Sequence, residues 1–363
     1  MERSRIGASG ASARSVFPQK RVPLYDVLRV LAILCVVLCH CVELMYASRN
    51  SWSYSLLHFV GRLGVPVFLF LTGALVMSKE FGSPERVARF YRHNLLDLLV
   101  TAEIWVVLYC LWMNLYGGVE VSIGSYLRYA LFIEMVPFAH WWYIPTILSI
   151  YVVVPLISSG IATLSGDDGK VHLAIKVALG FSLFANFIIP SYSRFAPLLG
   201  LPSVGTQLVG SVFGPYLAYI ITGFLILHKK VLQGIPATIL ATLAALSSAC
   251  AVIEGYLAGD LWYDSLFLLT ASAALAELSR RLMSGLSGNS VPATRLLSAC
   301  SFGVFLVHMP VRDMIGPQLG AFPGAAGAVL LFLAVAVLSF AIALSVWFAT
   351  SPVAWLRRAL LDA

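Results

Sequence analysis

The stretch LYDVLRVLAILCVVLCHCVELMY, residues 24–46, decides the fold class of this chain. It is apolar over a length that crosses a hydrocarbon core of about 30 Å as a single α-helix. Similar runs recur along the sequence, and of its 363 residues 60% are hydrophobic and only 11% are charged. Soluble domains carry about 25% charged residues, whereas the mean hydropathy here is +0.88. The sequence therefore predicts an integral membrane protein.

Apolar runs separated by polar breaks predict an all-α bundle of about ten transmembrane helices. Lys and Arg gather in alternate loops, so the positive-inside rule predicts a multi-pass membrane protein with both termini in the cytoplasm. Residues 117–139 are expected at the outer surface or in a re-entrant segment. The predicted helices cover residues 24–46, 59–78, 95–115, 141–160, 172–190, 207–227, 237–253, 264–279, 296–315 and 325–350.

These limits predict three parts: a basic cytoplasmic tail (1–23), a transmembrane domain (24–350) and a short C-terminal tail (351–363). The lipid bilayer is the expected partner of the second part. The net charge of +7 is spread over alternate loops, so no nucleic-acid partner is expected. The six cysteines fall in apolar runs without the spacing of a metal knuckle, which favours core packing and predicts no metal site.

The first predicted helix carries an unusual number of ionisable residues: Asp26, Arg29, His40 and Glu43. Eleven positions separate Arg29 from His40, which returns the chain to nearly the same azimuth about 16 Å further along a helix. Ionisable groups inside a spanning helix cost a few kcal/mol and usually mark functional sites. The alternative is structural, with Asp26 and Arg29 paired at the interface and His40 bonded to a neighbouring helix.

Further candidates lie in other segments, and each has a structural alternative. Glu103 in the third predicted helix and His308 in the ninth can serve chemistry or interhelical hydrogen bonds. The basic loop with Arg89 and Arg92 can bind phosphates, since guanidinium groups match them, or can simply reflect topology. Trp142 falls in a predicted aromatic belt at the outer interface.

Several segments together resemble the acyltransferase-3 family. Residues 25–40 are similar to its first-helix signature, an Arg followed by ten residues and a His, and GVPVFLFLTG (64–73) resembles its second-helix pattern with Thr72 where Ser is usual. RFYR (89–92) has the family's Arg-x-x-Arg spacing, although another alignment puts Asn94 and Asp97 at the basic positions. HWWYI (140–144), FGPY (213–216) and SFGVFLVH (301–308) resemble later segments.

The resemblance implies a membrane O-acyltransferase, with an O-acetyltransferase as the expected type. The donor substrate would be cytoplasmic acetyl-CoA or another acyl-CoA, with no permanently bound cofactor, and the acceptor a hydroxyl of a lipid-linked or cell-surface glycan. His40 would act as general base or carry the acyl group. The other roles expected are charge stabilisation by Arg29, orientation by Asp26 or Glu43, CoA phosphate binding by Arg89 and Arg92, and support from Thr72, Glu103, Trp142 and His308.

Two other classes of function fit the same composition. A transporter or flippase would use the buried charges as a proton or substrate pathway, although repeated, interrupted helices are not apparent in the sequence. A catalytically silent partner in a glycan-synthesis complex would tolerate changes to these charges. Some members of the family carry an added extracytoplasmic esterase-like domain; here the sequence ends at Ala363, so transfer is expected to be completed by the membrane domain or by a separate partner.

Overall fold

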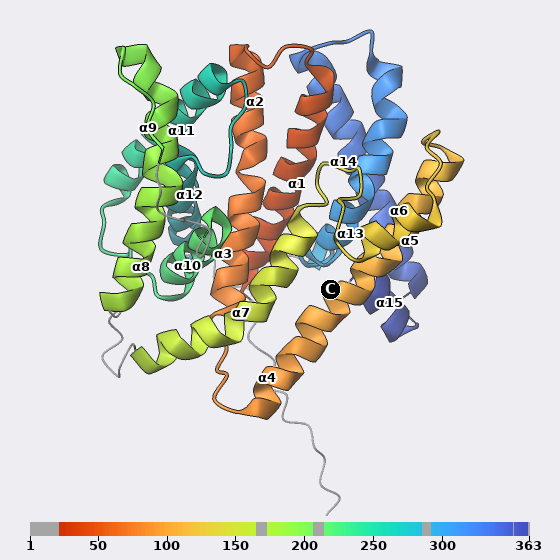
Figure 1. Ribbon diagram of the computed structural model, residues 1–363, viewed down its shortest axis with the longest axis horizontal. Helices are drawn as coiled ribbons and strands as arrows, with labels where there is room; N and C mark the ends of the chain where they lie inside the picture. Colours follow the sequence, from red (N-terminus) through yellow and green to blue (C-terminus); the bar gives the residue numbers. More distant parts are fainter. Residues whose placement is uncertain (1–21, 165–172, 206–213, 285–291, 351, 362–363) are drawn as a thin grey trace, which may run out of the picture.

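The protein is a bundle of helices in the computed structural model, which describes residues 22–164, 173–205, 214–284, 292–350 and 352–361 (Figure 1). No strand occurs within these ranges. The helices are α1 Pro23–Met45, α2 Trp52–Arg62, α3 Gly64–Val76, α4 Pro84–Phe90, α5 Asp97–Leu115, α6 Ile123–Ala130, α7 Tyr143–Leu164, α8 Leu173–Leu183, α9 Ile189–Phe195, α10 Pro215–Gly223, α11 Ala237–Ala258, α12 Leu266–Ser284, α13 Pro292–Ile315, α14 Ala325–Thr350 and α15 Ala354–Leu361. Wider π-helical turns (Tyr91–Leu96, Phe184–Ile188, Phe224–His228) and 3-10 turns (Ala196–Leu199, Gly316–Leu319) extend several of them.

Seven helical stretches of the described chain are long and apolar enough to cross a membrane. The protein is therefore a multi-pass membrane protein. The other three predicted spans correspond to α8 with α9, to α10 and to α12, which are not among these seven; α10 with the turn after it, Pro215–His228, is apolar but shorter. Residues 172 and 207–213 of those predictions lie outside the described residues. The seven stretches are Pro23–Met45, Trp52–Val76, Pro84–Leu115, Tyr143–Ile161, Ala237–Ala258, Pro292–Leu319 and Ala325–Thr350.

Two predicted helix starts were wrong, and side-chain caps explain why. The second span begins at Trp52 instead of residue 59, because the Ser51 hydroxyl accepts a hydrogen bond from the Tyr54 N–H at 3.2 Å. The third begins at Pro84 instead of residue 95, because Ser83 caps α4 in the same way. Arg89 and Arg92 consequently lie on helical turns and not in a loop.

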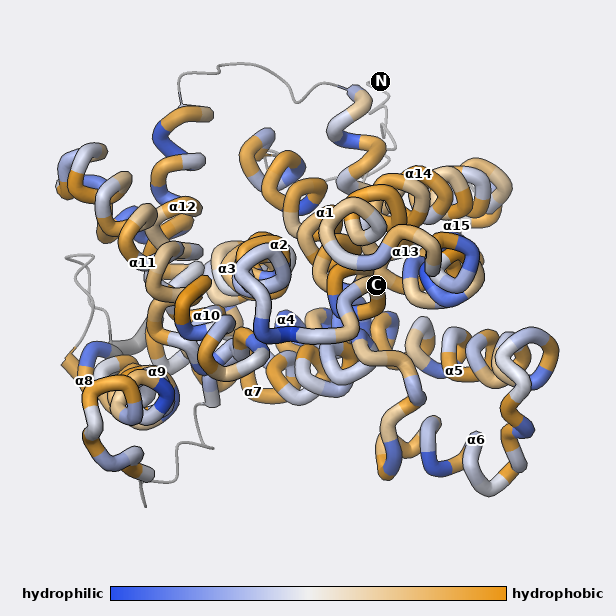
Figure 2. The backbone as a smooth tube through the Cα atoms, turned by 90° about the horizontal axis from the view of Figure 1, so that it is seen from above, coloured by the Kyte–Doolittle hydropathy of each residue, from blue (hydrophilic) through white to orange (hydrophobic). Residues whose placement is uncertain are grey.

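Helix α1 and the nearly continuous helix α2–α3 occupy the middle of the bundle (Figure 2). The spans formed by α11 and α14 are only 28% buried, so these helices present apolar side chains outward, as lipid contact requires. Helix α6 has no buried residue, while Phe138 after it packs on Tyr109 of α5 at 4.6 Å between ring centroids. Helix α6 therefore lies on the surface, whereas Val136 and Phe138 are buried, so the end of residues 117–139 enters the bundle and neither predicted alternative describes the whole segment.

Close contact between α1 and α2–α3 depends on two glycines. A Cβ atom on Gly61 would lie 2.6 Å from Cys39 Cα, and one on Gly64 would lie 2.5 Å from the Ala32 carbonyl oxygen. Small residues of this kind let helix backbones touch within a membrane. The contact brings the polar residues of α2 opposite the last two turns of α1.

The segment after α14 forms a helix of its own. The Trp105 indole of α5 donates to the Leu360 carbonyl at 3.2 Å, and Leu361 is buried. Residues 354–361, predicted as part of a tail, are thereby packed against the bundle in α15.

Candidate active site

His40 and Glu43 form a hydrogen-bonded pair one turn apart on α1. His40 Nδ1 lies 2.8 Å from Glu43 Oε2, and His40 is only 8% exposed. An ionised carboxylate can only accept, so Nδ1 carries the proton and Nε2 keeps a lone pair. The arrangement therefore leaves His40 able to take a proton at Nε2 while Glu43 holds its orientation.

Two more histidines, from distant parts of the sequence, lie next to this pair. The His308 ring of α13 stacks on His40 with centroids 5.5 Å apart, and the His140 ring, before α7, lies 6.5 Å from His40 and 4.9 Å from His308. Both added histidines are almost completely buried. The histidine cluster, His40, His140 and His308, is thus assembled by tertiary packing.

Neighbouring groups determine which nitrogen of each added histidine carries the proton. His308 Nδ1 lies 2.7 Å from the Phe305 carbonyl oxygen and so donates to it. The Tyr109 hydroxyl donates to the Leu306 carbonyl at 2.5 Å, so it accepts from His140 Nε2 at 3.1 Å. In their neutral forms, His308 at Nε2 and His140 at Nδ1 keep lone pairs that no described protein group occupies.

A cavity of about 180 Å³ is lined by Arg29 and Val36 of α1 and by Phe305 of α13. Phe305 lines it and also contacts the His140 ring, at 4.9 Å between centroids, so the cavity ends beside the cluster. Most of the lining is apolar, which suits a flexible organic chain. The polar and aromatic lining residues include Arg29, Thr72, Tyr143, Tyr151, Ser301 and Phe305.

A second cavity, of about 470 Å³, lies at the end of the bundle where α4 begins. Four basic residues line it, Lys79, Arg86, His228 and Lys229, together with Glu80, which pairs with Arg86 at 2.8 Å. Burial lowers the pKa of Lys79. Helix α7 borders both cavities: Tyr151 lines the first and Ser158 the second, two turns or about 10 Å apart along the helix.

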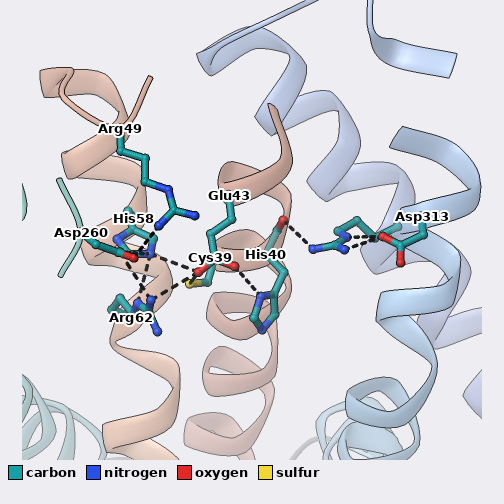
Figure 3. A network of polar contacts seen from close by, with 9 residues as sticks. Cys39, His40, Glu43, Arg49, His58, Arg62, Asp260 and Asp313 are labelled. Carbon is teal, nitrogen blue, oxygen red and sulfur yellow. Dashed lines mark hydrogen bonds and ion pairs between the residues drawn. The ribbon is translucent and has the colours of Figure 1, made fainter. Parts of the chain in front are cut away.

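On the other side of Glu43 lies a charged cluster, defined as Glu43, Arg49, His58, Arg62 and Asp260 (Figure 3). Glu43 Oε1 is 3.3 Å from Arg62 Nη2 and 3.4 Å from His58 Nε2. Arg62 also reaches Asp260 at 3.5 Å, and Arg49 binds the second Asp260 oxygen at 2.9 Å. Two guanidinium groups and two carboxylates therefore balance one another within a largely buried cluster.

A model of the acyltransferase-3 family, described as an acyltransferase domain, matches residues 23–348, nearly the whole chain. The chain belongs to the acyltransferase-3 family. Among curated proteins and among solved structures, no match was found. Membership makes the protein a membrane acyltransferase, and this favours the enzyme over the transporter alternative.

In this acyltransferase the predicted polar stripe of α1 separates into two regions. Arg29 lines the 180 Å³ cavity, whereas His40 and Glu43 lie together near the other end of the helix. Asp26 is buried and accepts a hydrogen bond from the Ser298 hydroxyl of α13 at 2.8 Å. Fourteen positions place it about 21 Å along the helix from His40. Of the two predicted orienting residues, Glu43 is the one that touches the histidine.

The supporting candidates fall at several places. Thr72 lines the 180 Å³ cavity and its hydroxyl donates to the Phe68 carbonyl at 3.0 Å, and His308 belongs to the histidine cluster. Glu103 is half-buried on α5. Trp142 stacks on Tyr216 with centroids 5.0 Å apart, outside the cluster.

Arg89 and Arg92, the predicted phosphate ligands, are exposed side chains. The described residues that line the two cavities include neither of them, and the segment contributes Arg86 instead. Arg89 lies at the end of α4 and Arg92 in the π-helical turn that continues it, and both side chains are exposed on the outer surface.

The sequence did not predict the charged cluster beside Glu43. His58 and Arg62 are four residues apart in an apolar stretch, a signal that the late predicted start of this helix at residue 59 obscured. His140 was considered only as part of a family-like segment. Asp260 gave no local signal, because its partners are about 200 positions away in the chain.

Proposed function

We propose that the protein is an inner-membrane O-acyltransferase, and specifically an O-acetyltransferase, that moves the acyl group of cytoplasmic acyl-CoA to a hydroxyl of a lipid-linked or cell-surface glycan. The observation that carries this proposal is the His40–Glu43 pair, which lies in the histidine cluster beside Phe305 of the cavity lining. A histidine whose second nitrogen is held by a carboxylate is the arrangement that enzymes use to deprotonate a hydroxyl.

In the proposed reaction the acceptor hydroxyl oxygen attacks the thioester carbonyl carbon while its proton passes to His40 Nε2. The tetrahedral intermediate collapses by breaking the C–S bond, and the leaving thiolate takes the proton back from Nε2. The products are an ester and free CoA, and His40 returns to its starting state. Glu43 stays ionised throughout and stabilises the imidazolium ion that forms between the two steps. The route through a transient acyl-histidine uses the same two residues.

Arg29 suits binding of the donor better than stabilisation of the reacting carbonyl. It lies about 16 Å along α1 from His40, which is beyond contact with the atoms that react there. The cavity of about 180 Å³ that Arg29 lines is mostly apolar with a few polar side chains, which suits the pantetheine arm of acyl-CoA with its methylene groups and amides. We place the nucleotide phosphates in the 470 Å³ cavity, where Lys79, Arg86 and Lys229 supply positive charge.

The acceptor approaches from the opposite end of the bundle in this proposal. His40 lies five residues before the end of α1, or about 8 Å from it. A donor entering past Arg29 and an acceptor entering past Met45 then meet at the histidine cluster. This geometry allows a cytoplasmic donor to serve an acceptor on the other side of the membrane.

His40→Ala tests the proposal. The purified protein in proteoliposomes is supplied with labelled acetyl-CoA and a lipid-linked glycan acceptor, and acetylated product is measured by mass spectrometry. Loss of the base should lower the rate by about 100-fold or more with normal abundance in the membrane. His40→Gln should be equally inactive, since an amide donates and accepts hydrogen bonds but takes no proton near neutral pH.

Ser248→Ala serves as the matched control, because its hydroxyl bonds the Ala244 carbonyl of its own helix, far along the chain from the cluster. It should acylate at the parental rate. Near-parental activity of the Gln variant would make His40 a packing residue, and His308 would then be the next residue to test as the base. Mass analysis of surface glycans from a deletion strain names the acceptor independently.

A further inference from the structure

The two oxygens of Glu43 have different partners. Oε2 is 2.8 Å from His40 Nδ1, whereas Oε1 is 3.3 Å from Arg62 Nη2. The orientation of the carboxylate, and with it the orientation of the imidazole, is thus fixed from both sides (Figure 3). Nothing in the acyl-transfer steps above uses the second contact.

Arg62 is well placed to keep that orientation, because it is itself held by several groups. Its side chain is 9% exposed. Its Nε donates to His58 Nε2 at 3.0 Å, and its Nη2 reaches Asp260 Oδ1 at 3.5 Å. The guanidinium lies over the Tyr263 ring, 4.9 Å from its centroid. A planar guanidinium held at this many points has little rotational freedom.

Hydrogen-bond direction identifies Arg62 as the group that secures Glu43. Because Arg62 Nε donates to His58 Nε2, that nitrogen presents a lone pair and, in the neutral ring, has no proton to give to Glu43. The 3.4 Å approach of His58 to Glu43 is therefore not the bond that holds the carboxylate. Arg62 supplies the donor, and His58 orients Arg62.

The charge balance of the cluster also indicates that Arg62 keeps Glu43 ionised. Without Arg62 the cluster would contain two carboxylates, Glu43 and Asp260, and one exposed guanidinium, that of Arg49. A buried carboxylate that loses its partner becomes costly; it turns toward water or takes up a proton. Either change removes the ionised acceptor from His40 Nδ1.

Cys39, Glu43 and His58 could also suggest a cation site, since their ligand atoms lie within 4.8 Å of one another. The Arg62 guanidinium contacts two of these three groups and occupies the His58 lone pair that a cation would need. The positive charge of Arg62 would repel a cation bound at this position, which argues against a cation site.

We propose that Arg62 is a positioning residue for acyl transfer: it holds Glu43 ionised and oriented so that Glu43 in turn orients His40. This inference rests on the proposed function, because it assigns Arg62 a part in deprotonating the acceptor. In this proposal, Asp260 in the loop between α11 and α12 holds Arg62 in place.

The test compares Arg62→Gln, Arg62→Lys, Glu43→Gln and the Arg62→Gln/Glu43→Gln double variant in the proteoliposome assay. Arg62→Gln should lower kcat about tenfold or more while the KM for acetyl-CoA stays within twofold. Arg62→Lys should recover part of kcat, because the ammonium keeps the charge but lacks the fork of donors. The double variant should be no slower than Glu43→Gln alone, since Arg62 acts only through Glu43.

Arg194→Gln is the control for loss of a partly buried ion pair. Arg194 binds Glu254 at 2.7 Å and Asp264 at 2.6 Å, away from the histidine cluster. It should lower the midpoint of thermal unfolding and leave kcat unchanged. Asp260→Asn, which loosens Arg62 without removing it, should show a smaller loss of kcat and gives a second folded variant should Arg62→Gln not accumulate.

Parental kcat in Arg62→Gln or Asp260→Asn, or additive losses in the double variant, would overturn the positioning role. A parent protein that transfers no acyl group to any hydroxyl would instead contradict the proposed function. The two failures are therefore distinguishable.

Discussion

In the proposed function, single side chains decide where the nucleotide phosphates of acyl-CoA bind. Arg86 and Lys229 line the 470 Å³ cavity, while Arg89 and Arg92 point to the outer surface of the same turns. All four side chains are exposed, so what separates them is that Arg86 and Lys229 converge on one cavity with Lys79, where their charges can act together on a phosphate. A basic run in the sequence therefore contains residues with different capacities for phosphate.

The double variant Arg86→Ala/Lys229→Ala should raise the KM for acetyl-CoA about tenfold, which corresponds to ~1.4 kcal/mol of lost binding. The KM for S-acetyl-pantetheine, which lacks the nucleotide, should not change. Arg89→Ala/Arg92→Ala should change either KM by less than twofold. The opposite ranking in steady-state kinetics would assign the phosphates to the Arg89–Arg92 pair.

Among the helices, the crossing of α3 and α10 fixes the position of the second cavity. A Cβ atom on Gly223 would lie 2.1 Å from Phe70 Cα, and one on Gly73 would lie 1.9 Å from the Ile220 carbonyl oxygen. The two backbones are in contact, and the π-helical turn Phe224–His228 follows directly after the crossing. This brings His228 and Lys229 beside the loop that carries Lys79.

Gly223→Ala should destabilise the protein by about 1–3 kcal/mol, the usual cost of overpacking, because the added methyl group meets backbone that cannot move aside. Thermal inactivation in detergent measures the effect. Gly160→Ala on α7 is the control: no atom lies within 4 Å of its added Cβ, and alanine favours a helix by about 0.5–1 kcal/mol. Equal midpoints for the two variants would mean that the crossing tolerates separation.

At the scale of the whole molecule, the described helices run back and forth between two ends with different charge. Lys79, Arg86 and Lys229 gather at the end where α4 begins. The opposite end pairs its arginines internally, as in Arg49 with Asp260 and Arg194 with Asp264. Arg86 is paired with Glu80 at 2.8 Å, but Lys79 and Lys229 add positive charge at this end, and an excess of cations predicts that this end faces the cytoplasm.

Reporter fusions after Lys230 and after Ala363 should therefore report the cytoplasm, and a fusion near Tyr192 the other side. This pattern corresponds to ten crossings with both termini inside. A cytoplasmic reading at Tyr192 would contradict the predicted orientation and would place the second cavity outside, where it could not receive CoA.

The sequence by itself determined what depends on neighbouring positions along one helix. The limits of α1, Pro23–Met45, agree with the predicted 24–46, because an apolar run of this length has one stable form in a bilayer. The shared face of His40 and Glu43 also follows from 3.6 residues per turn. Family membership was predictable as well, since its signature lies in short consecutive motifs.

Only the tertiary structure decided which helices meet. His140 and His308 reach His40 from segments 100 and 268 positions away in the chain, and Arg62 faces Glu43 because Gly61 lets two backbones touch at Cys39. Periodicity tells which face of a helix is polar, but not which partner that face will find. That choice is made by the steric fit of small residues between helices, since lipid gives apolar surfaces no preference for one neighbour over another.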